Sequence, residues 1–290
     1  MCFKRKRPPQ GGFWAVILDF ARDKPLGFAG GVLFLLMVLV AILAPLIAPF
    51  DPTRTDILSR LSAPSWEHFL GTDELGRDIL SRVIYGARIS TMVGLSTALL
   101  GTTVGAIVGI VSGYRGGRVD MITQRFMDVA MAFPGLILAM ALMAVLGPSL
   151  INVVIAIAIP SIPRANRVSR SVAISVKEFQ YIEAARAIGV KPARIIVYHI
   201  IPNCLASYLI VVTSMLGAAI LIEASLSFLG LGIPPPHPSW GRSLFQAMPY
   251  IYKAPWMGIF PGIAISLIVF AANMFGDALR DKWDPRLKRL

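Results

Sequence analysis

Charge is scarce in this chain of 290 residues. Charged residues make up 15% of it and hydrophobic residues 56%, whereas an average soluble domain carries about 25% charged residues. The deficit and a mean hydropathy of +0.68 indicate that lipid surrounds most of the chain. A net charge of +12 would indicate a nucleic-acid partner in a soluble protein. In a membrane protein the placement of the charges matters more, and no nucleic acid is expected.

Cysteine and histidine are also rare. The two cysteines, Cys2 and Cys204, lie far apart, and the three histidines fall in three different loops. This spacing makes a disulfide framework implausible and does not suit a metal site. No metal is expected.

Motifs for covalent chemistry are missing as well. A phosphate-binding P-loop needs Gly-x4-Gly-Lys-Ser/Thr, and this chain contains no Gly-Lys pair. We find no nucleophile elbow, paired carboxylates or zinc-binding helix. The chain is therefore not expected to be an enzyme or its own ATPase, and no bound cofactor is expected.

Long apolar runs are what the chain has in abundance. A hydrocarbon core of about 30 Å needs about 20 helical residues, and six runs qualify or nearly qualify, the fourth being short and containing Pro160. The predicted fold class is an all-α membrane protein with six transmembrane helices. The predicted spans are 28–47, 89–113, 126–146, 150–163, 204–229 and 256–279.

Lysine and arginine are unevenly distributed between the connecting segments. The segments 1–27, 114–125, 164–202 and 280–290 carry 21 of them, and the alternate segments 50–88, 147–149 and 230–255 carry 7. Because cytoplasmic loops are enriched in basic residues, both termini are expected in the cytoplasm. The first span is longer than the apolar region of a cleaved signal, and we interpret it as an uncleaved anchor.

The basic segment 164–202 contains a short helix–turn–helix pattern. A helix ending at Gly189 is expected, because glycine adopts the left-handed conformation of a helix C-cap at little cost. A second helix is expected to begin near Pro192, since proline is tolerated in a first turn. The pattern predicts two short helices on a membrane surface.

This pattern resembles the EAA loop of binding-protein-dependent ABC importers, in which a membrane subunit docks onto a separate ATPase. The resemblance implies that Glu183, Ala184, Ala185, Gly189 and Pro202 form an ATPase-coupling site. Glu183 would contact the ATPase, Gly189 would form the tight turn, and Pro202 would interrupt the helix before the fifth span. An ordinary amphipathic surface helix is the alternative, since such basic segments are common.

Three further runs resemble the C-type permease of dipeptide, oligopeptide and nickel ABC importers. They are Gly-Thr-Asp-Glu-Leu-Gly-Arg-Asp at 71–78, the run from Ala224 to Gly241, and the run from Gly276 to Pro285. The resemblance implies a type I importer permease fold. It also implies a second permease chain, two ATPase subunits that bind ATP, and an extracytoplasmic solute-binding protein.

The spans and loops together predict a division of the chain. Asp73 or Thr72 is expected to cap a helix that begins at Leu75. The predicted parts are a cytoplasmic tail 1–27, a first helix with an extracytoplasmic segment 28–88, a permease core 89–280 with its coupling loop 164–202, and a cytoplasmic tail 281–290.

Two features inside the spans remain open between structure and transport. Glu223 lies within the fifth span, where an ionisable group is costly unless it faces a cavity or a partner. It is a candidate for the translocation path or for a structural contact. Four glycines at intervals of four, from Gly101 to Gly113, favour close helix packing, with room for a solute as the alternative.

A transporter or channel that is not driven by ATP is the alternative from another class. Interrupted helices at Pro134 and Pro160 suit secondary transporters, but we find no inverted repeat. A membrane scaffold or sensor is disfavoured, because no large soluble domain is present.

Overall fold

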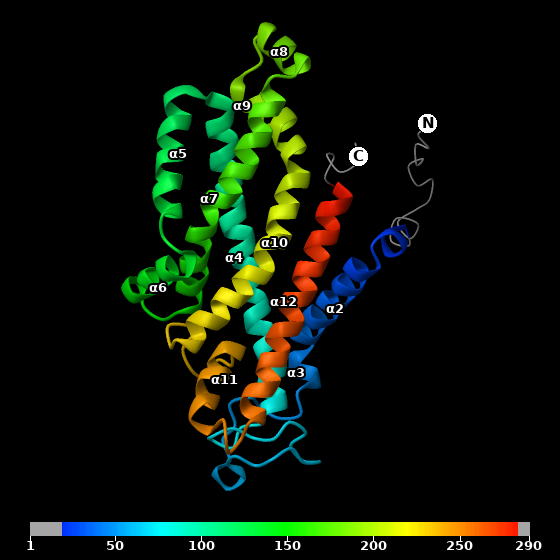
Figure 1. The fold of residues 1–290 in the computed structure, drawn as a ribbon, viewed down its shortest axis with the longest axis vertical. Helices are drawn as coiled ribbons and strands as arrows, with labels where there is room; N and C mark the ends of the chain where they lie inside the picture. Colours follow the sequence, from blue (N-terminus) through cyan, green and yellow to red (C-terminus); the bar gives the residue numbers. More distant parts are fainter. Residues whose placement is uncertain (1–18, 284–290) are drawn as a thin grey trace.

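The computed structural model describes residues 19–283, and helices account for nearly all regular structure in that range (Figure 1). No strand occurs among these residues, apart from an isolated bridge between Thr72 and Asp78. The helices are α2 (Pro25–Ile42), α3 (Ala44–Ile47), η1 (Ile57–Ser59), α4 (Ile79–Arg115), α5 (Gly117–Met131), α6 (Gly135–Leu146), α7 (Leu150–Lys177), α8 (Gln180–Ala187), α9 (Pro192–Ile195), η2 (Ile196–Ile200), α10 (Ile201–Phe228), α11 (Trp240–Ala247), η3 (Met248–Tyr250) and α12 (Trp256–Trp283).

The number of membrane-spanning helices differs from the predicted six. Within the described residues, four helical stretches are long and apolar enough to cross a membrane: α2, α4, α10 together with the short helices before it, and α12. The pair α5 and α6 makes a fifth if it is counted as one broken span. The all-α membrane class is confirmed, whereas the count of six is not.

The predicted third span, 126–146, is not one helix. Helix α5 ends at Met131, α6 begins at Gly135, and the two axes differ by 89°. Pro134 precedes α6 in an extended conformation. Because proline disfavours a helical conformation in the residue before it, Phe133 cannot continue α5, and the chain turns there.

The predicted fourth span ends too early. Helix α7 continues past Pro160 and Pro163 to Lys177, so residues 164–177 of the predicted loop belong to it. Proline is tolerated in membrane helices where neighbouring groups compensate for the lost hydrogen bond. Here α7 packs along α4 over most of its length, and this tertiary contact outweighs the local effect of the two prolines.

The regularly spaced glycines of α4 form its contact with α7. A side chain added at Gly101, Gly105 or Gly109 would collide with the backbone or side chains of α7. Along the pair, Gly101 meets Ala158 and Gly109 meets Asn166, so the two helices run parallel. The packing interpretation of this ridge agrees with the structure.

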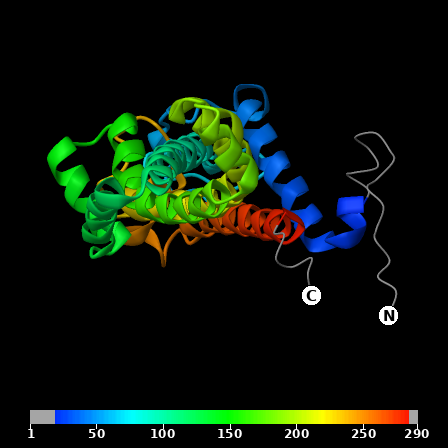
Figure 2. The same cartoon turned by 90° about the horizontal axis from the view of Figure 1, so that it is seen from above.

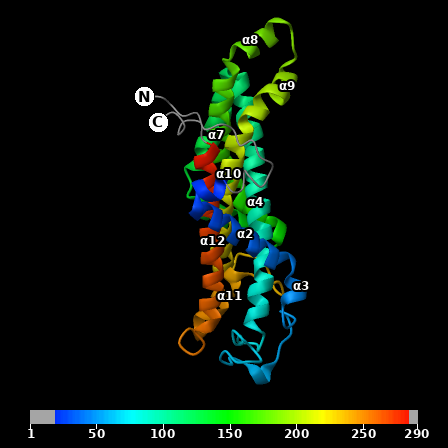
Figure 3. The same cartoon turned by 90° about the vertical axis from the view of Figure 1, so that its right-hand side faces the viewer.

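The molecule is elongated, with distinct ends (Figure 1). Helix α4 has 37 residues and, at 1.5 Å per residue, measures about 55 Å. Residues 48–78 and α11 gather at one end, which we call the loop end, and α8 and α9 lie at the other, which we call the α8 end (Figures 1 and 3). Seen from above, α5 and α2 lie on opposite sides of the bundle (Figure 2).

The first turn of α4 is capped by Asp78 rather than by Thr72 or Asp73. The Asp78 carboxylate accepts hydrogen bonds from the Ser81 backbone N–H at 2.8 Å and from the Ser81 hydroxyl at 2.7 Å. The prediction of a helix from Leu75 is therefore wrong. Asp73 instead accepts from the backbone N–H groups of Leu75 and Arg77 and closes the loop before the helix.

Candidate functional site

The helix–turn–helix at the α8 end follows the local sequence signals. Helix α8 ends at Ala187, and Gly189 adopts a left-handed conformation with φ +77°. The Gly189 N–H donates to the Arg186 carbonyl and the Val190 N–H donates to the Ala185 carbonyl, both at 3.0 Å. This pair of bonds is a Schellman motif. The predicted left-handed Gly189 and the helix start at Pro192 are both confirmed, although α8 itself ends two residues before the glycine.

An apolar cluster holds this turn onto the bundle. Ile182 on α8, Ile195 on α9 and Ile200 on η2 are fully buried, and they pack with Ala173 and Val176 at the end of α7. The cluster also includes Cys204 of α10, so the turn is packed against both α7 and α10.

The predicted coupling residues divide between the core and the surface. Ala185 is buried in the apolar cluster, while Glu183, Ala184, Gly189 and Pro202 are exposed. No hydrogen bond or ion pair ties the Glu183 side chain among the described residues. Four of the five predicted coupling residues are therefore exposed at the α8 end.

Apolar side chains accompany them on this surface. Ile188 is 81% exposed at the tip of the turn. Phe179 and Tyr181 are about half exposed, with ring centroids 5.7 Å apart, and the Tyr181 ring lies 5.8 Å from that of His199. Exposed apolar residues of this kind, surrounded by polar ones, are typical of a protein contact surface.

The expected break at Pro202 is absent. Helix continues from Pro192 to Phe228 as one stretch of 37 residues, and the turn before Pro202 is a π-helix over Ile196–Ile200. A wider turn accommodates a proline that cannot donate a backbone hydrogen bond. Asn203 adds a bond from its amide to the His199 carbonyl at 2.7 Å.

Glu223 is fully buried within α10. Its carboxylate accepts hydrogen bonds from the hydroxyl groups of Ser90 on α4 at 2.9 Å and of Ser227 at 2.8 Å. Ser239, which caps α11, lies against the same carboxylate. The side chain thus joins three helices, and in this conformation it is shielded from solvent.

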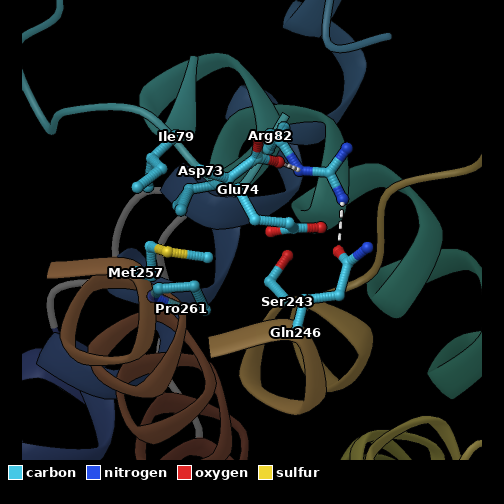
Figure 4. Close-up of a pocket in the computed structure, with 9 residues that line it drawn as sticks. Asp73, Glu74, Ile79, Arg82, Ser243, Gln246, Met257 and Pro261 are labelled. Carbon is cyan, nitrogen blue, oxygen red and sulfur yellow. Dashed lines mark hydrogen bonds and ion pairs between the residues drawn. The ribbon is translucent and has the colours of Figure 1, made fainter. Parts of the chain in front are cut away.

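A network of charged residues at the loop end was not anticipated from the sequence (Figure 4). Arg82 is almost fully buried; its guanidinium lies 3.5 Å from the Asp73 carboxylate and donates to Gln246 on α11 at 3.2 Å. Arg77 binds Asp73 at 2.6 Å and Glu74 at 3.1 Å. Burial, and then the neighbouring Asp73 carboxylate, raise the pKa of Glu74 above its usual value.

The comparisons with known proteins agree with the fold. Residues 77–289 match the sequence model of the family described as "Binding-protein-dependent transport system inner membrane component". Residues 12–64 match a second model, the N-terminal transmembrane domain of oligopeptide transport permease C. The chain belongs to the family of binding-protein-dependent transport system inner membrane components.

Relatives of this permease cover nearly its whole length. A dipeptide transport system permease protein of Alkalihalophilus pseudofirmus is 42% identical over 95% of this chain and 90% of its own. A di/tripeptide permease protein of Pseudomonas aeruginosa is 42% identical over 97% and 93%. A glutathione transport system permease protein of Pectobacterium atrosepticum is 41% identical over 98% and 94%. These relatives are named as transport permeases, not as enzymes.

Solved structures support the fold alone. A chain of the methionine ABC transporter MetNI, in an inward-facing conformation, superposes with a TM-score of 0.55 at 19% identity, covering 69% of this chain and 97% of that one. The ABC importer type of permease fold is thereby confirmed. The family match and the long apolar helices identify this permease as a multi-pass protein of the inner membrane.

A second group of charges, between α5 and α7, was also missed. Asp120 pairs with Arg170, and Asp128 pairs with Arg167 at 2.8 Å. Between these pairs, the Gln124 amide donates to the Asn166 side chain at 3.1 Å. The polar residues of α5 recur at intervals of four, a periodicity that indicates a polar helix face. This periodicity is the feature of the sequence from which the polar contacts of α5 could have been predicted.

Proposed function

We propose that this permease is the transmembrane subunit of an ATP-driven importer that moves di- or oligopeptides, or a related small solute, into the cell. The observation that supports a peptide most directly is its identity of 42% to two permeases named for dipeptides and di/tripeptides. Glutathione, in the name of a third relative, is itself a small peptide. The bound cofactor of this machine, ATP, would reside on partner chains.

The proposed assembly contains a second permease subunit, two ABC ATPase subunits and an extracytoplasmic solute-binding protein. The excess of basic residues in alternate segments supports cytoplasmic termini and a cytoplasmic position for the α8 end. In this orientation the chain divides into cytoplasmic tails, an outward segment and a membrane core. These parts are the tails 1–27 and 281–290, the outward segment within 28–88, and the core 89–280 with the loop 164–202.

Coupling would run through the exposed turn at the α8 end. Glu183, Ala184, Gly189 and Ile188 present a mixed polar and apolar surface, while Ala185 anchors α8 in the apolar cluster. A push from an ATPase on this surface would move α7 and α10 with it, because the anchoring residues are fully buried between them. Pro202 and the π-helical turn would set how α10 responds.

Replacement of Gly189 tests this coupling. The left-handed conformation costs a residue with a β-carbon about 1–2 kcal/mol, and no atom lies within 4 Å of the added carbon. Gly189→Val should therefore distort the turn without any clash, and uncouple ATP hydrolysis from transport in the reconstituted complex. Gly189→Asn is the matched control, because asparagine tolerates this conformation, and it should retain coupling.

A second control places the same strain elsewhere. Gly147 has φ +77° and equally open surroundings, but it lies between α6 and α7, away from the α8 end. Gly147→Val should leave hydrolysis and transport coupled. Normal coupling in Gly189→Val, or equal uncoupling in both variants, would contradict the assignment.

Purification of the tagged chain in mild detergent tests the assembly itself. Recovery of a second permease and of ATPases with P-loops supports the importer. Recovery of the chain alone, with transport that needs no ATP, would favour the alternative of a secondary transporter or channel.

A further inference from the structure

Helices α2 and α12 are in close contact where α2 begins and α12 ends, and they separate toward the loop end (Figure 2). Near the start of α2, a side chain added at Gly27 would collide with Ala278, and one added at Gly30 would lie 2.7 Å from the Met274 β-carbon. Glycine and alanine let two backbones approach closely. Toward the loop end, side chains of both helices, among them Met37 on α2 and Phe260 on α12, line a common space.

A cavity of about 220 Å³ lies where the two helices separate. Helices α2, α4 and α12 form its walls, and the indole of Trp240, at the start of α11, forms part of its lining. The residues that line it are Met37, Val40, Leu70, Val83, Ile84, Ala87, Trp240, Phe260, Ile263, Ala264 and Leu267.

Water is a poor occupant of this cavity. Every lining side chain is apolar except for the indole N–H of Trp240, which already donates to the Val83 carbonyl at 2.8 Å. A buried water needs two to four polar partners, and an engineered apolar cavity of about 150 Å³ stays dry yet binds benzene. The cavity therefore has the size and the chemistry for a hydrocarbon.

The cavity is continuous with an exposed apolar surface formed by the membrane-spanning helices α2 and α12. Ile263 and Leu267 belong to its lining and are 50% and 40% exposed. The adjoining Leu36, Leu39 and Ile259 are about half exposed as well. In contrast, helix α5, whose Asp128 pairs with Arg167, lies on the side of the bundle opposite α2 (Figure 2). An apolar cavity that opens onto an apolar face of membrane-spanning helices suits a hydrocarbon chain of the surrounding lipid.

We propose that this cavity binds one acyl chain of a membrane lipid, inserted between α2 and α12 from the leaflet at the loop end. The chain would contact Trp240 and would fill the space that the two diverging helices leave. Because the cavity also touches α4, the bound chain would stabilise the packing of α2 on the bundle. This inference is independent of the solute that the permease transports.

Brominated lipids test the proposal directly, because bromine on an acyl chain quenches the fluorescence of a tryptophan at short range, without needing an exposed indole. The assembled transporter is reconstituted into phosphatidylethanolamine and phosphatidylglycerol vesicles, with or without bromine along the acyl chains. The Trp240 signal is the difference between the wild type and Trp240→Phe. We expect this signal to lose intensity in the brominated vesicles, although Trp240 is only 1% exposed.

Filling the cavity provides the second arm. Ala264→Leu places a larger side chain in the cavity and should reduce the quenching. Ser266→Leu, an exposed position on the same helix that does not line the cavity, should leave the quenching unchanged. If Trp240→Phe does not assemble, these two variants are compared directly with the wild type.

Two results would overturn the proposal. An unquenched Trp240 signal in the assembled transporter would mean that a partner chain covers the cavity or that it stays empty. Quenching in Ala264→Leu as strong as in the wild type would mean that the lipid reaches Trp240 by another route.

Discussion

Arg170 on α7 binds Asp120 on α5 through two parallel hydrogen bonds. Its Nε donates to Oδ1 at 2.6 Å and its Nη2 donates to Oδ2 at 2.5 Å. No residue of α5 is buried, so polar contacts hold this helix more than apolar packing does. The pair therefore attaches α5 to the helix that leads into the turn at the α8 end.

Arg170→Lys should weaken this attachment. Lysine keeps the charge but cannot reproduce the two-pronged geometry of arginine, and loss of one charge-assisted bond at this partly exposed pair should cost about 1 kcal/mol. Unfolding can be followed through the thiol of Cys204, which is buried in the folded chain, with a thiol-reactive dye in a Cys2→Ser background. Arg167→Lys, at the half-exposed pair with Asp128, should have a smaller effect. An equal effect at both sites would contradict the special role of the Asp120 pair.

Gly105→Leu should be among the most destabilising changes in α4. Its side chain would meet the Ile162 carbonyl and the Ala165 side chain, and overpacking of this kind costs about 1–3 kcal/mol. Val104→Leu, at the adjacent and partly exposed position, adds one methylene group toward open space and should be neutral. Thermal unfolding of the two variants, measured with the same dye, checks the ridge. Equal stability would mean that α4 and α7 are less tightly packed than described.

Local chemistry was enough to predict some elements. The turn at Gly189 and the helix start at Pro192 depend on single residues with strong backbone preferences, and the glycine ridge depends on a simple repeat. The importer fold was anticipated from motifs such as the run at 71–78, with the resemblance supplying what composition alone could not.

Tertiary contacts explain what could not be predicted. Pro134 interrupts the third span, whereas Pro160 and Pro163 leave α7 intact because α4 packs beside it. Likewise, the sequence does not indicate whether Asp73 or Asp78 is the N-cap residue of α4, because both aspartates precede this helix. The pairing of Asp120 with Arg170 joins residues 50 positions apart, and no local pattern names the partner.

Glu74 should make the loop end more stable in acid. Its pKa is raised, first by burial and then by Asp73, so the folded state binds the proton more tightly than the unfolded state. Its stabilising contribution is complete below the unfolded value near 4.5 and is lost as the pH rises through the higher folded value. Glu74→Gln should flatten unfolding stability against pH in this interval and should not reduce stability at neutral pH. The exposed Glu67→Gln is the control and should keep the wild-type profile. A wild-type profile in Glu74→Gln would contradict the account.

Glu223 tests whether a buried carboxylate serves structure alone. Glu223→Leu leaves the hydroxyl groups of Ser90 and Ser227 without their acceptor, and each unsatisfied group costs about 1–3 kcal/mol, so this variant should unfold well below the wild-type temperature. Glu223→Gln keeps the shape and one acceptor oxygen, and should lose about 1 kcal/mol of unfolding free energy.

Transport per assembled complex then separates a structural role of Glu223 from a role in translocation. Because Ser239 lies against the carboxylate, movement of α11 would be needed to expose it to a solute. If Glu223→Gln assembles normally but transports poorly, the carboxylate takes part in translocation. Normal transport by this variant would assign Glu223 to the packing of α4, α10 and α11.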